Sequence, residues 1–208
     1  AVFGNTAGGA AYSGALADFL LMSSNANMFI TGPDVVEGVT GEKLTKESLG
    51  NSNLHAENGT CHIICSEDEI LARIRQLLSY LPQNNLEHPP IVTTGTQEDK
   101  SAQLIEEIIP GNQLSYNILP IIIKIFDNFM ELQPSFAPNF VTGFARLNGS
   151  TVGVVASQPL VLAGCLDINA SCKIARFVRF CDAFNIALIN IVDTPGYLPG
   201  SEKERQGI

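Results

Sequence analysis

The chain lacks the features that mark several large classes of protein. No apolar run approaches the roughly 18 residues that a membrane-spanning helix needs, and the longest candidate, residues 118–123, is followed directly by Lys124. No segment resembles a secretory leader. Only 16% of the residues are charged and the net charge is -9, so clustered Lys and Arg for binding phosphates are missing. We therefore expect no direct membrane insertion and no nucleic-acid partner.

Signals for paired cysteines or for a metal are also missing. The five cysteines are an odd number at irregular spacing, and no two of them form a CxxC pair. Each lies in or beside an apolar segment, which favours buried free thiols over disulfides or metal ligands. His55 and His62 lie seven residues apart beside Glu57, but a metal would need a third ligand, so ordinary hydrogen bonding is the better interpretation. We expect no metal site and a cytoplasmic location.

Common catalytic motifs are absent as well. There is no GxSxG element and no pair of carboxylates at a telling spacing. The residues from Asp193 to Gly196 match the DxxG element of GTPases, but the chain has neither a Gly-Lys-Ser/Thr phosphate loop nor an NKxD element. We therefore favour a tight turn after a buried strand over a GTP site. Loops at the carboxyl ends of strands are nonetheless where α/β folds bind ligands.

Glycine, by contrast, is concentrated near the start of the chain. A short apolar segment at residues 1–3 leads into a turn with Gly4, Gly8 and Gly9, and a helix of small residues follows. Such a turn can present consecutive backbone N–H groups to an anion, or to an oxygen on which negative charge develops. Close packing of glycines between a helix and a sheet is the alternative explanation.

Periodicity predicts two α/β segments. In the first, residues 19–22, 28–31 and 61–65 form strands, and residues 37–60 form a surface loop with a single turn. A capping box of Ser66 and Glu69 should start a long helix that ends at Pro82. Its apolar face is expected to contain Ile70, Leu71, Ile74, Leu77, Leu78 and Leu81.

The second segment follows a stretch without periodicity, residues 83–112, that contains several prolines. It should open with a helix over residues 116–130. Asn148-Gly149 predicts a hairpin between residues 140–147 and 151–156. A helix should lead to a buried strand at residues 188–192, and the residues that recur on one of its faces are Ile168, Cys172, Ala175, Val178 and Cys181. Since strand, helix and strand alternate, we expect parallel pairing.

Six strings together carry a resemblance to a known family. The chain resembles the carboxyltransferase subunit of biotin-dependent acyl-CoA carboxylases, a group that includes propionyl-CoA carboxylase beta chains and methylmalonyl-CoA decarboxylase alpha subunits. The resemblance runs from the first residue to the last. Departures from the family pattern occur at Ser157, usually Asn, at residues 50–52 and at residues 201–207. The strings are residues 4–13, 29–36, 157–159, 164–169, 173–186 and 191–200.

The resemblance implies an α/β fold of the crotonase/ClpP-like type, a ββα superhelix, with parts of two such domains. Residues 1–86 would be the latter part of the N-terminal carboxyltransferase domain, residues 87–112 a linker, and residues 113–208 the first part of the C-terminal domain. The chain would then be a fragment of a considerably longer subunit.

The resemblance also implies the chemistry. The family moves a carboxyl group between carboxybiotin and an acyl-CoA through an enolate, and backbone amides stabilise the developing oxyanions. The amides facing the thioester would be those of Gly8, Gly9 and Ala10, while the amides facing biotin lie, in the family, beyond Ile208. Weaker candidates for the biotin-side wall, each equally explained by a turn, a helix cap or loop packing, are Gly164, Asp167, Pro195, Gly196 and Tyr197.

Several partners follow from the same resemblance. An acyl-CoA would be the substrate, and biotin would be carried on a separate biotin carboxyl carrier protein. Biotin carboxylase or decarboxylase subunits would complete the complex, and the full-length subunit would form a homo-hexamer. Two alternatives remain open: transfer in the decarboxylase direction within a sodium-pump complex, and a CoA-binding or assembly module without turnover.

Overall fold

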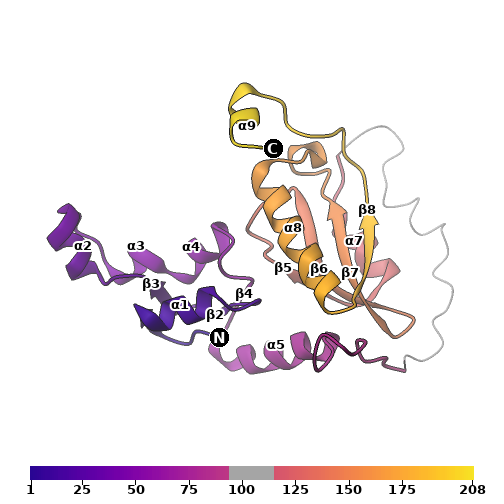
Figure 1. Cartoon of the computed structure of the whole chain (residues 1–208), viewed down its shortest axis with the longest axis horizontal. Coiled ribbons are helices and arrows are strands. Elements are labelled where there is room, and N and C mark those ends of the chain that lie inside the picture. Colours follow the sequence, from indigo (N-terminus) through magenta and orange to yellow (C-terminus); the bar gives the residue numbers. More distant parts are fainter. Residues whose placement is uncertain (94–114) are drawn as a thin grey trace. The chain divides into compact units, whose positions relative to one another are not determined.

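The chain consists of two compact units in its computed structural model (Figure 1), which describes residues 1–93 and 115–208. The first unit is Ala1–Gln76 and the second is Leu77–Ile208. Most of the expected linker, residues 94–112, lies outside the described residues. No helix in the two described ranges is long and apolar enough to cross a membrane.

The first unit is built on two parallel strand pairs. Strand β1 (Asn5–Ala7) pairs with β3 (Asn27–Phe29), and β2 (Leu21–Ser23) pairs with β4 (Ile63–Cys65). The strands predicted at residues 19–22, 28–31 and 61–65 are confirmed to within two residues, and so is their parallel pairing. The first strand, β1, lies within the expected glycine-rich turn and not at the apolar residues 1–3. The small core beneath these strands contains Val2, Ala11, Leu20, Met22, Ala26, Met28 and Cys61.

Short helices connect the strands of this unit. Helix α1 (Gly9–Ala15) follows β1, and α2 (Pro33–Thr40) follows β3 with Pro33 in its first turn, where proline is tolerated best. Helix α3 (Lys46–Gly50) lies where the predicted loop over residues 37–60 has its single turn, but α4 (Ser52–Glu57) contradicts the loop prediction. The polar residues that suggested a loop include the helix caps. The Thr45 side chain accepts from the Ser48 amide, and the Asn51 side chain accepts from the Leu54 amide.

Helix α5 (Glu67–Tyr80) begins and ends close to the predicted bounds. Of the predicted capping box the glutamate half is present, because the Glu69 carboxylate accepts from the Ser66 amide and hydroxyl at 3.3 and 2.9 Å.

The buried face of α5 differs from the prediction. Ile70, Leu77 and Tyr80 are buried, whereas Leu71 is 55% exposed and Leu78 is 60% exposed. Each residue advances about 100° around a helix, so Leu71 and Leu78 lie well to one side of the stripe that runs from Ile70 to Tyr80. The sequence pattern treated Tyr80 as neutral and therefore placed the stripe too far round the helix.

The second unit contains a four-stranded sheet in the order β5-β6-β7-β8. Strands β5 (Asp127–Leu132), β6 (Phe140–Leu147) and β7 (Ser150–Ser157) are antiparallel, and β8 (Ala187–Ile191) is parallel to β7. At the β6–β7 turn Asn148 has φ 50° and Gly149 has φ 79°. Positive φ at both central residues is what a tight hairpin turn requires, so the predicted hairpin is confirmed.

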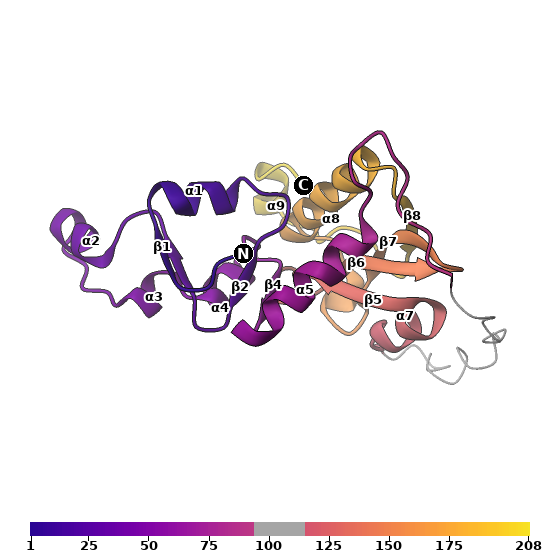
Figure 2. The ribbon, with the colours of Figure 1, turned by 90° about the horizontal axis from the view of Figure 1, so that it is seen from below.

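Two helices cover opposite faces of this sheet (Figure 2). Helix α7 (Leu119–Ile125) packs against one face and α8 (Ile168–Ala183) against the other, where the α8 residues Phe177 and Cys181 approach Gly153 of β7. The remaining elements are a 3-10 turn, η1 (Leu162–Gly164), and α9 (Ser201–Arg205). The core on the α7 side contains Ile118, Ile121, Ile122, Phe126, Val141, Ala145, Val152, Val154 and Ala156.

The helix predicted over residues 116–130 is too long. Helix α7 ends at Ile125, and the chain enters β5 at Asp127. The pattern of buried residues changes at this point. In the helix adjacent residues are buried, whereas in the strand every second residue is: Met130 and Leu132 are buried and Glu131 between them is not. The continuous apolar composition of this segment concealed that change of period.

The buried side chain of Arg146, on β6, hydrogen-bonds to the end of α5 and to the segment that follows it. The Arg146 guanidinium donates to the carbonyl oxygens of Ser79, Pro90 and Gly149 at 2.6, 2.9 and 3.1 Å. The Val92 amide also donates to the Gly149 carbonyl at 3.0 Å. Ser79, Pro90 and Val92 are therefore tied to the β6–β7 hairpin within the second unit.

Candidate functional site

The glycine-rich turn joins β1 to α1. Gly8 has φ 60° and ψ -131°, a conformation that only glycine adopts readily. Its amide donates to the carbonyl of Ile30, just after β3, at 3.1 Å, and its carbonyl accepts from Ala11 and Tyr12 at 3.0 and 3.2 Å. Gly8 is therefore committed to holding the turn, and its N–H group is not available to a ligand.

The next two amides are in a different position. Gly9 and Ala10 are the first two residues of α1, where N–H groups have no partner within the helix. Neither amide has a hydrogen-bond partner among the described residues, and both residues are exposed. A Cβ added to Gly9 would meet nothing within 4 Å. Of the three predicted donors, the structure therefore leaves two adjacent amides accessible and uses the third to fix them.

Two of the candidates for a biotin-side wall have clear structural roles. Gly164 is buried with φ 70°, and an added Cβ would lie 2.5 Å from the carbonyl oxygen of Asp193. Asp167 caps the N-terminus of α8, since its carboxylate accepts from the Ala170 amide at 2.8 Å. It also accepts from the Asn139 side chain at 3.3 Å. Gly164 therefore allows a close backbone approach, and Asp167 stabilises the start of α8.

The other three candidates lie in the loop after β8. Leu166 pairs with this loop: its amide donates to the Gly196 carbonyl at 2.9 Å, and its carbonyl accepts from the Leu198 amide at 2.8 Å. Pro195 is exposed, and the ring of Tyr197 is 62% exposed. The pairing carries Tyr197 to the rim of a groove, and it is the only one of the five candidates that lines it.

The groove lies between α8, β8 and the loop that follows β8, and its volume is about 420 Å³. Its surface is mostly apolar, with hydroxyl and amide groups from Ser171, Thr194 and Asn190. The lining residues are Phe140, Val155, Ser157, Leu166, Ser171, Ile174, Ala175, Val178, Asn190, Ile191, Val192, Thr194 and Tyr197.

Sequence reasoning missed the α8 side of this groove. It predicted one helix face with Ile168, Cys172, Ala175, Val178 and Cys181. Of these, Cys181 is buried and faces the sheet together with Phe177, whereas Cys172 is exposed, and Ala175 and Val178 line the groove. The helical spacing of small and branched residues was a valid signal of a packed face, but it did not show what that face packs against.

Asp193, the first residue of the DxxG match, is held by protein groups. Its amide donates to the Ser157 hydroxyl at 3.1 Å, and its carboxylate accepts from the Tyr116 hydroxyl at 2.7 Å. Burial raises the pKa of Tyr116 to about 12, and the hydrogen bond and negative charge of Asp193 add to the effect. A carboxylate engaged in this way fixes the loop after β8, which agrees with the turn interpretation. The strand before it is not the buried strand that the sequence predicted, because no residue of β8 is buried.

This contact predicts that Tyr116, one of four tyrosines, ionises only at high pH. Because the folded-state pKa of Tyr116 lies above its ordinary value, the contribution to stability is fully present below about pH 10 and is lost as the pH rises toward 12. A titration of tyrosinate absorbance should therefore lose one phenol that titrates near pH 12 in Tyr116→Phe. Tyr12→Phe, at an exposed position, serves as the control, and an absorbance change near pH 12 that is the same in Tyr116→Phe as in the wild type would contradict the assignment.

The histidines make backbone hydrogen bonds, as expected. His55 Nε2 lies 2.5 Å from the Met28 carbonyl, and His62 Nδ1 accepts from the Leu20 amide at 3.1 Å. Within residues 1–93 and 115–208, no three His, Cys, Asp or Glu side chains gather in a way that could hold a metal ion. All five cysteines are free thiols.

Comparison of the chain with known proteins identifies one family. The carboxyl transferase domain matches residues 1–208, and the chain belongs to that family. The methylmalonyl-CoA decarboxylase subunit alpha of Veillonella parvula is 47% identical over 213 residues. The propionyl-CoA carboxylase carboxyltransferase subunit of Haloferax mediterranei is 48% identical over 214 residues. Each alignment covers 100% of this chain and 42% of the relative.

A solved structure agrees with these relatives. It is a transcarboxylase 12S hexamer with methylmalonyl-CoA and methylmalonic acid bound, and it matches with a TM-score of 0.92 and 45% identity. The match covers 99% of this chain and 41% of that chain. The family and the fold predicted from the sequence are thereby confirmed. The chain spans about two fifths of the length of the proteins it matches.

Proposed function

We propose that the chain is part of a carboxyltransferase that moves a carboxyl group between biotin and an acyl-CoA of the propionyl-CoA or methylmalonyl-CoA type. The observation that carries this proposal is the pair of unpartnered amides at Gly9 and Ala10, on a turn fixed by Gly8, in a member of the carboxyl transferase family. Two adjacent N–H groups at a helix start suit an oxygen that gains negative charge during the reaction.

In this mechanism the amides of Gly9 and Ala10 hold the thioester carbonyl oxygen as the α-carbon becomes an enolate. The open space beside Gly9 lets the thioester approach the backbone closely. Gly8 keeps the two donors in place through its hydrogen bond to Ile30. Biotin, carried on a separate carrier protein, supplies or accepts the carboxyl group.

We assign the groove of the second unit to the biotin side. Its mostly apolar lining fits a compact ring system, and Tyr197, Ser171 and Thr194 offer hydroxyl groups at its edge. Gly164 and Asp167 support the wall, while Pro195 and Gly196 shape the loop that carries Tyr197. The residues present therefore fit a biotin headgroup.

The relatives are named for both reaction directions, carboxylation and decarboxylation. We infer that the same two amides serve either direction, because the enolate is common to both. A biotin carboxyl carrier protein, a biotin carboxylase or decarboxylase subunit, and assembly into a homo-hexamer complete the proposal. The five free thiols support a cytoplasmic location.

The first test is a thermal-shift titration of the complete protein with propionyl-CoA, free CoA and GTP–Mg²⁺ in parallel. Stabilisation by propionyl-CoA beyond that by free CoA is expected, because only the thioester reaches the amides of Gly9 and Ala10. Equal shifts with CoA and propionyl-CoA would favour a CoA-binding or assembly module. A shift with GTP–Mg²⁺ alone would overturn the proposal.

A further inference from the structure

A lysine ammonium is buried in the second unit among backbone carbonyls. Lys173, on α8, is 2% exposed. Its Nζ donates to the carbonyl oxygens of Gln133, Phe136 and Phe140 at 2.9, 2.8 and 2.8 Å. The carbonyl of Ala137 lies farther away at 3.4 Å. Gln133, Phe136 and Ala137 belong to the connection between β5 and β6, and Phe140 is the first residue of β6, so one side chain binds this connection along its length.

The charge is essential to this arrangement. An ammonium has three N–H groups, and three carbonyl oxygens lie at short distances from it. Burial lowers the pKa of Lys173 to about 8, and the attraction of Glu131 partly opposes this shift. Lys173 is therefore charged in the folded protein below about pH 8, and because its folded-state pKa lies below the ordinary lysine value, holding that charge costs stability relative to the unfolded chain. A buried charge that costs stability is best explained by the conformation it specifies.

The connection needs such an anchor. Gln133 and Ala137 have φ of 53° and 44°, in the left-handed region that residues with a Cβ avoid. Their amino-acid types give no local reason for that conformation. The carbonyls that this backbone turns inward are the ones that Lys173 binds.

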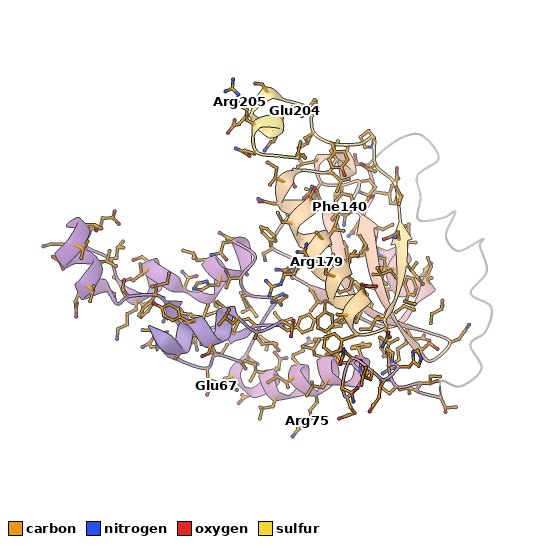
Figure 3. The ribbon with its side chains drawn as sticks, viewed as in Figure 1. Glu67, Arg75, Phe140, Arg179, Glu204 and Arg205 are labelled. Carbon is orange, nitrogen blue, oxygen red and sulfur yellow. The ribbon has the colours of Figure 1, made fainter. Side chains whose placement is uncertain are left out.

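Residues at the end of this connection contact the wall of the groove. Asn139, 1% exposed, donates from its side chain to the Cys165 carbonyl at 2.8 Å, and its own carbonyl accepts from the Gln158 amide at 2.9 Å. The adjacent Leu166 pairs with the backbone beside Tyr197. Phe140, which directly follows Asn139 at the start of β6 (Figure 3), lines the groove itself.

We propose that Lys173 is a positioning residue that holds the groove wall of Phe140, Leu166 and Tyr197 in the shape that receives its ligand. Lys173 does not line the groove, so it acts through the β5–β6 connection and through Asn139. The assignment of biotin as that ligand rests on the proposed function, whereas the mechanical role of Lys173 does not.

The test compares Lys173→Met with Arg179→Met in the complete protein. Both variants remove one positive charge from α8, but Arg179 is exposed (Figure 3). We expect Lys173→Met to lower kcat/KM for free biotin as carboxyl acceptor about tenfold, with KM for the acyl-CoA unchanged. Amide hydrogen exchange over residues 133–140, 165–167 and 196–198 should accelerate about tenfold. Arg179→Met should leave all of these values as in the wild type.

Several outcomes would overturn the proposal. One is faster exchange spread evenly over the second unit with equal losses for both substrates, which would indicate general destabilisation. Another is unchanged exchange in the three segments. If Lys173→Met does not fold, Asn139→Ala breaks the next contact in the series and should give the same split between biotin and acyl-CoA. A wild-type protein without transfer to biotin would refute the proposed function, and the exchange pattern would still decide the role of Lys173.

Discussion

Replacing Gly9 by proline in the complete protein should lower kcat for carboxyl transfer by ~10²–10³-fold, the usual effect of removing one oxyanion donor. Proline has no N–H group, and the first position of a helix is where it disturbs the helix least. Gly9 occupies that position in α1, and its surroundings are open. The substitution therefore removes a proposed donor with little effect on the fold.

The matched control is Gly9→Ala, which keeps the N–H group and adds only a methyl group into open space. Its kcat should remain near that of the wild type. Gly9→Val tests access separately, because a branched side chain should exclude the thioester without unfolding the chain. Equal rates for Gly9→Pro and Gly9→Ala would remove the Gly9 amide from the mechanism.

Gly164→Ala should lower the free energy of unfolding by about 2–4 kcal/mol, as the sum of a strained backbone and an overpacked contact. Gly164 has φ 70°, and the new methyl group would lie 2.5 Å from the Asp193 carbonyl oxygen. Neither η1 nor the backbone after β8 can move freely, because Leu166 is paired with Gly196 and Leu198. Chemical denaturation of the variant and the wild type measures the difference.

Gly207→Ala separates the two causes. Gly207 has φ 82°, but an added Cβ would meet nothing within 4 Å, so this variant has the backbone strain alone. It should cost only the strain contribution, about 1 kcal/mol. Similar losses for Gly164→Ala and Gly207→Ala would show that the contact with Asp193 is unimportant, and that the loop after β8 is not held from this side.

The local features of the fold were predictable because neighbouring residues determine them. Asn148-Gly149 fixes its hairpin turn through backbone preference alone, and Gly8 signals a turn that other residues cannot adopt readily. The short helix at Ser52–Glu57 was missed, because Asn51 acts as its cap although asparagine also favours loops. Asparagine is common both at helix caps and in loops, and the sequence alone did not distinguish the two.

The candidate site divides in the same way. The exposed amides of Gly9 and Ala10, which we propose as donors, lie where the sequence predicts a turn that presents N–H groups, because a glycine-rich turn before a helix has a direct physical meaning. The groove could not, since it depends on where α8 lies against β8 and on how Leu166 pairs with the loop beyond. The contacts of Lys173 were equally hidden. They join residues separated by 33 to 40 positions, and no local pattern announces them.

The hydrogen bond from Gly8 to Ile30 has a thermodynamic consequence for ligand binding. Ordering a free segment costs roughly 1–2 kcal/mol per residue in backbone entropy. Here the turn is tied to the β1–β3 pair before any ligand binds. The backbone entropy of the turn is therefore lost during folding and does not weaken the binding free energy. The heat and entropy of acyl-CoA binding should consequently be those of a rigid receptor.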